Sequence, residues 1–503
     1  MEQRSAAASV PELAEDNLGF FRWGRVAGQV LVSNDAGDWT FLSEPEFADL
    51  LAGRVTADHA RFEELQRKGF VRDGLDIEAL TARMAQRNQH LRRGPWVHVV
   101  NLTRRRAAAA GGGGNGAAAS SPDMSTETIE RIVNFVLQSP SPSIDFEIQG
   151  DAGEPLFHLD GLRHLVEFAQ ARNQRETGKA LTFRVLSNFT GLTEAAAEWL
   201  IADEVRVSTR LDGPADVHDA NCQHLGGSAY ADVARWIDYF HRRYGELGRD
   251  PRQWRVEALM NTTRRTLAAG TAVVDEYVAR GLSAIHLQPL EAWQFDADTW
   301  AAIGYEWSEY LEFYRHTLDY ILDLNRRGVE IAERQAGIFA AKILTFDDPG
   351  IVDIQSPSGA GTGQLVYDVD GRMFPCDEAR IAAAMGDPLF ELGRAGELSI
   401  AEIVRHPTVR AIAAASLLDA QPMCGDCWNK PFCGFSPVRN FLSQGDLFGQ
   451  RPRCLECKEH MAVSRRVFEL LADADDPASA DALKRWGAPA HATASRRAQR
   501  AAP

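Results

Sequence analysis

Alternating apolar and polar positions mark a β-hairpin near the start of the chain. Apolar residues alternate with polar ones over 30–32 and again over 39–41, and turn-forming residues stand between them at 34–37. Two such runs separated by a short turn predict a pair of antiparallel strands. Amphipathic stretches at 44–53 and 59–71 predict two short helices behind this hairpin.

These elements predict a small module of winged-helix type over residues 18–90. A domain that only packs against the rest of the chain is the alternative, because a fold alone does not determine a function. The preceding residues 1–17 are polar and rich in alanine, a composition that predicts a disordered segment.

From residue 96 onward, apolar strands alternate with amphipathic helices. Ser125, for example, is placed to cap a helix whose apolar positions fall on one face. Six strand-like runs occur, at 96–102, 144–148, 181–188, 205–213, 255–263 and 284–290. The alternation predicts an α/β fold over 96–335, a parallel sheet wrapped by helices as a full or partial (β/α) barrel. The chemistry of such folds lies on the loops that follow the carboxyl ends of the strands.

The remaining chain lacks this alternation. Residues 350–470 carry most of the cysteines and predict a separate small domain. Residues 472–503 are dominated by Ala, Asp, Pro and Arg, which predicts a disordered tail.

Charge and hydropathy narrow the class of protein. The formal net charge is −16 and the pI is near 5.3, which argues against general binding to nucleic acid or to anionic membranes. No apolar run has the roughly 20 residues of a membrane helix, and the first residues do not resemble a signal peptide. We therefore expect a cytoplasmic protein, in which a dense group of cysteines favours a metal site over disulfides.

Five of the seven cysteines lie in one window, at Cys424, Cys427, Cys433, Cys454 and Cys457. The C-x2-C-x5-C spacing of the first three places soft ligands on one turn-rich loop, and either of the last two can complete a set of four. Four thiolates suit a tetrahedral zinc ion or a 4Fe–4S cluster. The sequence leaves both metals open, and also which late cysteine is the fourth ligand.

A further cysteine, Cys376, lies upstream in the pattern Gly371-x4-Cys376. This pattern, followed by the cysteine window, resembles the SPASM domain, which holds auxiliary clusters at the C-terminus of many radical S-adenosylmethionine (SAM) enzymes. The strand–helix alternation fits their core, and LDGP at 211–214 with His218-Asp219 resembles their strand-four motif.

The resemblance extends over about residues 18–470. LVSNDAGDWTFLS, HVVNLTR, GTGQLVYDVDGRMFPCDEAR and KPFCGFSPVRN are similar to radical SAM maturases of the His-Xaa-Ser peptide system. It implies a ribosomally made precursor peptide as substrate and a second radical SAM maturase as a partner. It also implies that Cys376 and the cysteines of the window are cluster ligands.

The chain departs from this family where the reaction would take place. A radical SAM enzyme has a C-x3-C-x2-C loop after its first strand, but the three positions here are Arg106, Ala110 and Gly113. No cysteine precedes Cys222. The run GGGG at 111–114 is not a phosphate loop, because it lacks the following Lys-Ser/Thr. We interpret it as a flexible loop.

The positions that would contact SAM are also altered. The resemblance assigns Gly153, Glu154 and Asn188 to SAM binding, but the first two follow a two-residue insertion in GDAGEP. Arg210 replaces the serine usual before Leu-Asp-Gly, and Cys222 replaces an arginine.

Two auxiliary ligand positions have likewise lost their thiols. Ser358 stands where an early cysteine would precede Gly371, and Ser436 or Pro437 stands where one would follow Cys433. A hydroxyl is a poor substitute for a thiolate toward iron.

We therefore expect a radical SAM/SPASM protein that is impaired in SAM cleavage and retains one iron–sulfur site and peptide or partner binding. An active maturase and a zinc-stabilised scaffold are the alternatives. The altered loop has two explanations that the sequence does not separate, a natural degenerate paralogue and a disrupted sequence.

Two residue pairs and one tryptophan have a structural interpretation. His218-Asp219 is interpreted as a structural pair rather than a catalytic one. Asp377-Glu378 is interpreted as a solvated pair rather than an acid/base pair. Trp428 is interpreted as a packing cover for the cysteine window.

Overall fold

A computed structural model describes residues 17–106, 122–150, 153–222 and 228–488. The segments predicted to be disordered at 1–16 and 489–503, and the loop positions Ala110 and Gly113, lie outside the described residues.

The N-terminal module is built on a three-stranded antiparallel sheet. Its strands are β1 (Arg22–Val26), β2 (Gln29–Ser33) and β3 (Trp39–Leu42), in that order. The predicted hairpin is β2–β3, and β1 was not predicted. Ala27 and Gly28 form the β1–β2 turn with φ of 52° and 74°, the left-handed conformation that a tight hairpin requires. Helices α1 (Glu44–Leu51), α2 (Phe62–Arg67) and α3 (Ile77–Arg87) complete the module.

An eight-stranded sheet forms the centre of the molecule, in the order β13-β12-β11-β4-β5-β6-β7-β8. Its parallel strands are β4 (Val97–Asn101), β5 (Ser143–Gln149), β6 (Ala180–Leu186), β7 (Val205–Arg210), β8 (Glu257–Leu259) and β11 (Gln364–Tyr367). The antiparallel strands β12 (Arg372–Phe374) and β13 (Gly393–Arg394) come from the cysteine-rich region, which thus extends the sheet beyond β4. The α/β fold with parallel strands is confirmed.

The sheet is open rather than closed into a full barrel. The predicted strand 284–290 contains only β9 (Ala284–Ile285), which pairs with β10 (Ala332–Glu333) in a separate two-stranded sheet. An isolated bridge between Thr262 and Pro289 joins this pair to the segment after β8. Pro289 cannot donate a ladder hydrogen bond, which limits the strand here.

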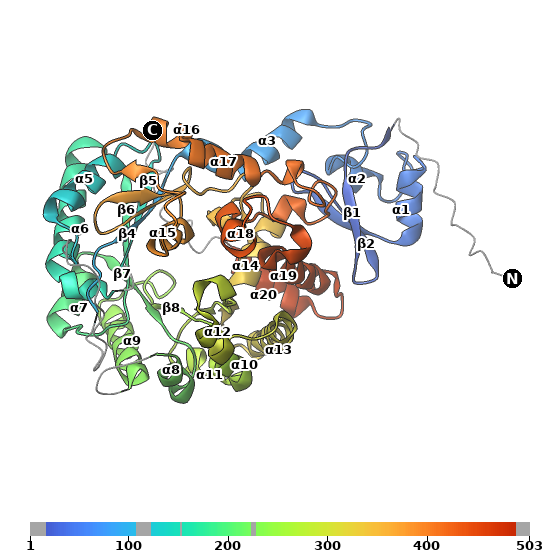
Figure 1. The fold of residues 1–503 in the computed structure, drawn as a ribbon. Helices are drawn as coiled ribbons and strands as arrows, with labels where there is room; N and C mark the ends of the chain where they lie inside the picture. The colour runs from blue at the N-terminus through green and yellow to red at the C-terminus, as the bar shows by residue number, and fades with distance from the viewer. Residues whose placement is uncertain (1–16, 107–121, 151–152, 223–227, 489–503) are drawn as a thin grey trace.

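Helices cover the outer face of the sheet (Figure 1). They include α5 (Thr126–Val136), α6 (Leu159–Glu176), α7 (Glu194–Ala202) and α9 (Ala229–Glu246). The side chain of Ser125 caps α5 by accepting from the backbone of Thr128, as predicted. On β5, Ile144, Phe146 and Ile148 are fully buried on one face, so the alternating acids point to the other.

The opposite face of the sheet carries charged side chains. Arg184 on β6 pairs with Glu257 on β8 at 2.6 Å. Burial raises the pKa of Asp145 and of Glu147 on β5, although nearby arginines oppose the shift. This face of the sheet is therefore polar, and its acidic side chains lie near arginines of opposite charge.

The rest of the chain is largely helical. It contains α8 (Ala215–Asn221), α10 (Arg264–Ala269), α11 (Ala272–Ala279), α12 (Ala297–Ile303), α13 (Trp307–Arg326), α14 (Arg334–Leu344), α15 (Asp377–Ala384), α16 (Ile400–Arg405), α17 (Pro407–Ala415), α18 (Pro437–Gln444), α19 (Leu455–Ala472) and α20 (Pro477–Gly487). Among the described residues, none of these helices is long and apolar enough to cross a membrane.

The prediction of a disordered tail from residue 472 is wrong for 477–487. Helix α20 begins at a cap formed by Asp476 and packs on α14, with Ala482 and Leu483 fully buried. Its small residues allow the close approach, since the Gly487 backbone abuts that of Ala341. The alanine content that suggested disorder here serves helix formation and packing.

Candidate metal centre

The cysteine loop, residues 424–433, is a tight turn with three of the five clustered thiols. Backbone hydrogen bonds run from Cys427 N to Cys424 O (3.1 Å) and from Cys433 N to Lys430 O (3.2 Å). Cys454 directly precedes α19, and Cys457 lies in its first turn. All seven cysteines are free thiols.

Burial and neighbouring thiols both raise the pKa values of the clustered cysteines. Burial raises the pKa of Cys424, Cys427 and Cys433, and the Cys457 thiol adds to the rise in each of the three. The thiol of Cys454 is 3% exposed, and its charged neighbours are Glu456, Arg451 and Cys457.

The donor chemistry of the clustered thiols suits either a zinc ion or a 4Fe–4S cluster. Zinc bonds of about 2.3 Å in a tetrahedron place the sulfurs about 3.8 Å apart. A 4Fe–4S cluster is larger and holds its thiolates further apart. Cys424, Cys427 and Cys433 with Cys454 or Cys457 form a donor set that suits such a cluster chemically.

Cys376 does not join this group. It is 1% exposed at the start of α15, and burial followed by the carboxylates of Glu378 and Asp353 raises the pKa of its thiol. The serine hydroxyls at the positions of the missing thiols form hydrogen bonds with the backbone. Ser358 Oγ donates to Val352 O at 3.3 Å, and Ser436 caps α18.

Carboxylates gather around Arg439 between Cys376 and the other thiols. Arg439 pairs with Glu291 at 2.6 Å, with Glu456 at 2.9 Å and with Glu378 at 3.6 Å. Burial raises the pKa of Glu378 to about 7, so the expectation that Glu378 is solvated is wrong. Its partner Asp377 is more exposed and pairs with Arg380 at 2.8 Å.

At the carboxyl edge of the sheet, Glu154 is held entirely by the protein. It is 2% exposed, and its carboxylate accepts from Ser187 Oγ (2.7 Å), Asn188 N (2.8 Å) and Leu156 N (3.1 Å). Burial raises the pKa of Glu154 to about 7, although the three donors oppose this shift. Glu154 and Asn188, two of the residues expected to contact SAM, therefore bond to each other: the Glu154 carboxylate accepts from the backbone N–H of Asn188.

The other two expected SAM contacts have local structural roles. The Asn188 side chain is exposed and accepts from Thr190 N at 2.8 Å, closing a turn. Gly153 packs against the end of β4, and a Cβ there would lie 2.7 Å from the carbonyl oxygens of Thr103 and Arg105.

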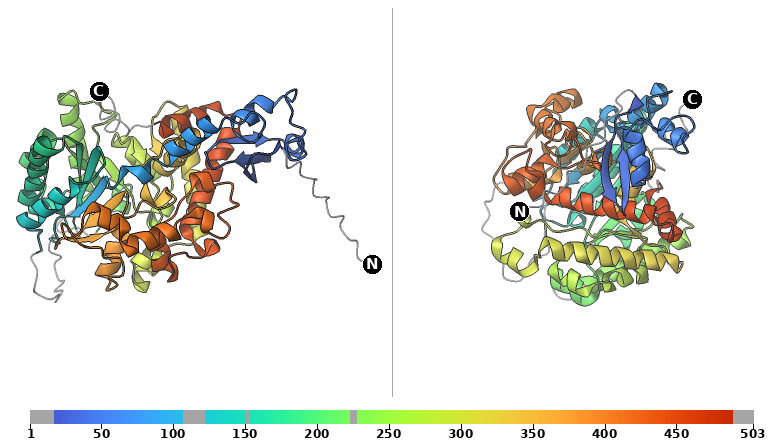
Figure 2. Two further views of the ribbon diagram at one scale, coloured as in Figure 1. Left: turned by 90° about the horizontal axis from the view of Figure 1, so that it is seen from above. Right: turned by 90° about the vertical axis from the view of Figure 1, so that its right-hand side faces the viewer.

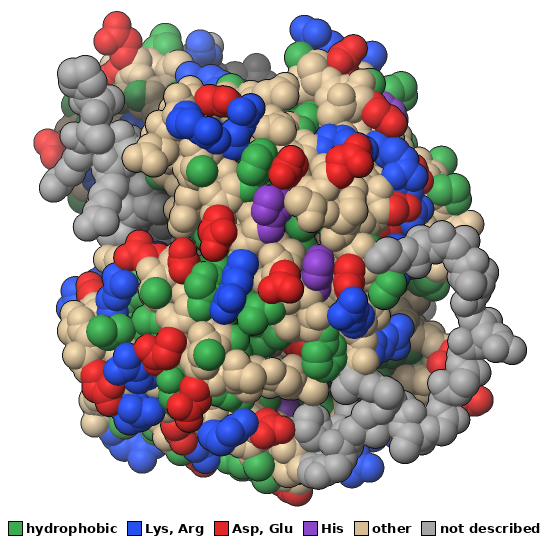
Figure 3. All heavy atoms as spheres, turned by 90° about the vertical axis from the view of Figure 1, so that its left-hand side faces the viewer, with side chains coloured by type: hydrophobic (Ala, Val, Ile, Leu, Met, Phe, Trp, Pro, Cys, Tyr) green, Lys and Arg blue, Asp and Glu red, His purple; other side chains and the backbone are tan. Residues whose placement is uncertain are grey.

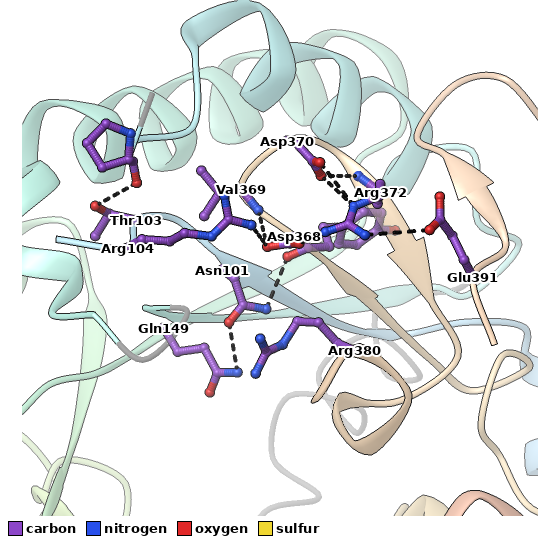
Figure 4. A network of polar contacts seen from close by, with 12 residues as sticks. Asn101, Thr103, Arg104, Gln149, Asp368, Val369, Asp370, Arg372, Arg380 and Glu391 are labelled. Carbon is purple, nitrogen blue, oxygen red and sulfur yellow. Dashed lines mark hydrogen bonds and ion pairs between the residues drawn. The ribbon is translucent and has the colours of Figure 1, made fainter. Parts of the chain in front are cut away.

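Residues just after β4 bond to Asp123, which follows the segment 107–121 in sequence. Thr103 Oγ1 donates to Asp123 at 2.6 Å, and Arg105 pairs with the same carboxylate. Arg104 pairs with Asp368 at 2.9 Å, which Arg372 also holds at 2.6 Å (Figure 4). The sequence did not reveal that Asp368, in the YDVDGR segment, binds this strand end.

A second set of contacts extends this network toward α15. Gln149 donates to Asn101 and to Asp377, each at 3.3 Å. Figure 4 shows Asn101, Gln149 and Arg380 lying beneath the arginine–aspartate pairs. The polar groups at this edge of the sheet therefore bond to one another.

A third polar group follows β7. Asp212, His218 and Cys222 place their ligand atoms within 4.8 Å of one another. Arg210 donates to both oxygens of Asp212 at 2.9 and 2.6 Å, and Asp212 N donates to His218 Nδ1 at 3.1 Å. The Arg210 guanidinium already pairs with Asp212, and His218 Nδ1 already accepts a hydrogen bond. The three residues are therefore unsuitable as a cation site.

The structural interpretation of His218-Asp219 and of Trp428 agrees with their contacts. Asp219 accepts from Ser228 Oγ and Tyr230 N at 2.6 and 2.8 Å, fixing the start of α9. Trp428 is 7% exposed and packs edge-on against Phe468 with ring centroids 5.6 Å apart.

No protein-family model and no curated protein matches the chain. Among solved structures, native anSMEcpe with bound AdoMet is similar, with 15% identity and a TM-score of 0.60 over 78% of this chain and 100% of that one. SuiB of Streptococcus suis bound to S-adenosylmethionine has 13% identity and a TM-score of 0.50 over 87% and 98%. SuiB bound to its precursor peptide SuiA has 14% identity and a TM-score of 0.50 over 89% and 99%. The chain thus shares the fold of radical SAM maturase structures.

Proposed function

We propose that this chain is a radical SAM/SPASM-type protein of a ribosomal-peptide maturation system that does not cleave SAM. The observation that carries the proposal is the carboxyl edge of the sheet. The strand end that should supply three thiolates offers Arg106 instead, and no cysteine precedes Cys222. Glu154 and Asp212, which line the same edge, already bond to protein donors. The core cluster does not fit these residues.

One auxiliary cluster is part of the proposal. Cys424, Cys427, Cys433 and Cys457 would hold it, and a 4Fe–4S cluster would supply structural cross-linking and one-electron redox capacity there. Zinc is the second candidate, because four thiolates suit it chemically.

The partners are inferred from the family resemblance and from the neighbours. SuiB has been solved with its precursor peptide, which supports peptide binding by a chain of this fold. The sequence motifs point to the His-Xaa-Ser system, and a second, complete radical SAM maturase would then carry out the chemistry. The N-terminal module of winged-helix type is the candidate for peptide or partner contact. Free thiols suit a cytoplasmic location.

Metal analysis tests this proposal. Protein purified without oxygen should contain about four irons and four sulfides per chain. Zinc without iron would support the scaffold alternative, and about eight irons would show a second cluster and contradict the proposal.

Calorimetric titration with SAM is the second test. We expect no binding, because the acceptors at the sheet edge are already occupied. Micromolar affinity would contradict the interpretation of Arg210 and of the GDAGEP insertion as disabling.

A further inference from the structure

The cysteine loop lies against the N-terminal sheet rather than against the parallel sheet. Strand β1 contacts α19, and the N-terminal module lies beside the C-terminal helices in two views (Figures 1 and 2). The two segments are about 400 residues apart in sequence, as the separation of 403 positions between Arg22 and Gly425 shows. The contact is therefore a tertiary one that the fold must assemble.

Backbone carbonyls of the cysteine loop accept hydrogen bonds from side chains of the module. Arg22 Nε donates to Gly425 O, and Arg87 donates to Pro431 O. Ser33, which is fully buried, donates to Trp428 O at 2.7 Å. A buried carbonyl without a donor is costly, so these three bonds fix the backbone of the loop.

Ion pairs support the same contact, with buried Lys430 and Arg22 side chains and an Asp35 side chain that is 36% exposed. Asp35 pairs with Lys430 of the loop at 2.8 Å and with Arg22 of β1 at 2.9 Å. Burial raises the pKa of Asp35, but hydrogen bonds from Lys430 and Arg22 outweigh it and hold the pKa below its ordinary value. Lys430 is 9% exposed and also pairs with Asp419.

Packing leaves no space at this contact. A Cβ at Gly24 of β1 would lie 2.3 Å from Trp428 Cδ1, closer than any side chain can approach. Phe468 of α19 packs edge-on against both Trp428 of the loop and Trp39 of β3. The loop is thus enclosed between the module and α19.

The other end of the loop is held differently. Cys433 Sγ lies 3.8 Å from His460 Nδ1, and His460 Nδ1 donates to Gly434 O at 3.1 Å. Lys342 of α14 is another close neighbour of Cys433. Cys433 is therefore positioned by α14 and α19, and Cys424 and Cys427 by the module.

We infer that the N-terminal module is a positioning element for the metal centre, with Ser33 and Asp35 setting the places of the Cys424 and Cys427 thiols. The presence and the identity of the metal rest on the proposed function, whereas the contacts between the module and the loop do not. Any peptide or partner that displaces the module would, by the same contacts, change the geometry of these two thiols.

The test is the rate at which iodoacetamide alkylates each cysteine in the full-length, chelator-treated protein, followed by mass spectrometry. The variant Ser33→Ala/Asp35→Asn removes two contacts to the loop. We expect alkylation of Cys424 and Cys427 to rise by about tenfold, because the loop opens more often. Cys433 and the barrel residue Cys222 should react at the wild-type rate.

Two further variants control this result. Glu44→Gln removes the same charge from the module as Asp35→Asn, but its ion pair with Arg25 is exposed, so it should leave every rate unchanged. Gly24→Ala pushes a methyl group against Trp428 and should accelerate the same two thiols. A wild-type rate at Cys424 and Cys427 in both test variants would overturn the inference.

Iron content separates this inference from the proposed function. If wild-type protein binds iron, the double variant should lose it to a chelator about tenfold faster, as expected for the loss of outer contacts around a metal site. If wild-type protein binds no iron, the proposed cluster fails, while the alkylation rates still decide whether the module positions the loop.

Discussion

The carboxyl edge of the sheet and the cysteine loop are both places where the family resemblance expects an iron–sulfur cluster, but they differ in what their polar groups do. At the sheet edge, Glu154 accepts three protein hydrogen bonds and Asp212 is held by Arg210. In the cysteine loop, the thiols remain and the surrounding backbone is held from outside. The polar groups at the sheet edge thus bond to one another, whereas the cysteine loop keeps its thiols and is held by contacts from the N-terminal module and α19.

The largest expected effect is a difference in iron content between a variant of Cys457 and a variant of Cys454. Cys457→Ser should reduce iron to near zero, because its thiol is the fourth ligand of the proposed set. Cys454→Ser should retain at least most of the iron. Iron and sulfide analysis of both variants after anaerobic reconstitution measures this. The reverse result would show that α19 presents its other cysteine to the cluster.

The next effect is at the sheet edge. Arg210→Ser restores the residue that the family has there, but it leaves the fully buried Asp212 without its guanidinium. Arg210 is partly exposed, so we expect a loss of about 1–3 kcal/mol in the free energy of unfolding rather than the full cost of an unpaired buried charge.

Urea denaturation followed by circular dichroism gives this number. Arg235→Ser is the matched control, since Arg235 pairs with Asp232 only at the surface, at 3.5 Å. The control should change stability by less than about 0.5 kcal/mol. Equal stability of the two variants would mean that the Arg210–Asp212 pair does not close the site.

A smaller effect is expected for Glu154→Gln. The amide can keep the acceptor for Ser187 and Leu156, but its NH2 group would face the Asn188 N–H, so one hydrogen bond is lost. We expect destabilisation by about 1–2 kcal/mol in thermal unfolding. If the variant were as stable as wild type while SAM binding changed, Glu154 would be a ligand contact and not a structural acceptor.

Much of the fold follows from sequence pattern, because each element there has a strong local signal. The hairpin, the cap at Ser125 and the parallel strands are predicted by period and turn chemistry. Helix α20 was missed because its alanines and acidic residues also suit a disordered tail, and only burial against α14 distinguishes the two. Strand β1 was missed because its hairpin turn uses Ala27 in a left-handed conformation.

The candidate site was only partly predictable, because part of it depends on tertiary contacts that leave no local signal in the sequence. Soft ligands at fixed spacing identify the metal centre, and missing ligands identify the altered sheet edge. The choice of Cys457 over Cys454 depends on how α19 is placed, and the support from Ser33 and Asp35 depends on contacts across the whole chain. Positive and negative side chains are intermixed on the face drawn in Figure 3.

The most direct test of the central claim is the amount of 5′-deoxyadenosine formed by anaerobically reconstituted protein with a strong reductant and SAM. The claim is that the sheet edge no longer holds the cluster that cleaves SAM. We predict no 5′-deoxyadenosine above the level of a reaction with heat-denatured protein, even when the protein carries about four irons. Stoichiometric or repeated formation of 5′-deoxyadenosine would contradict the account.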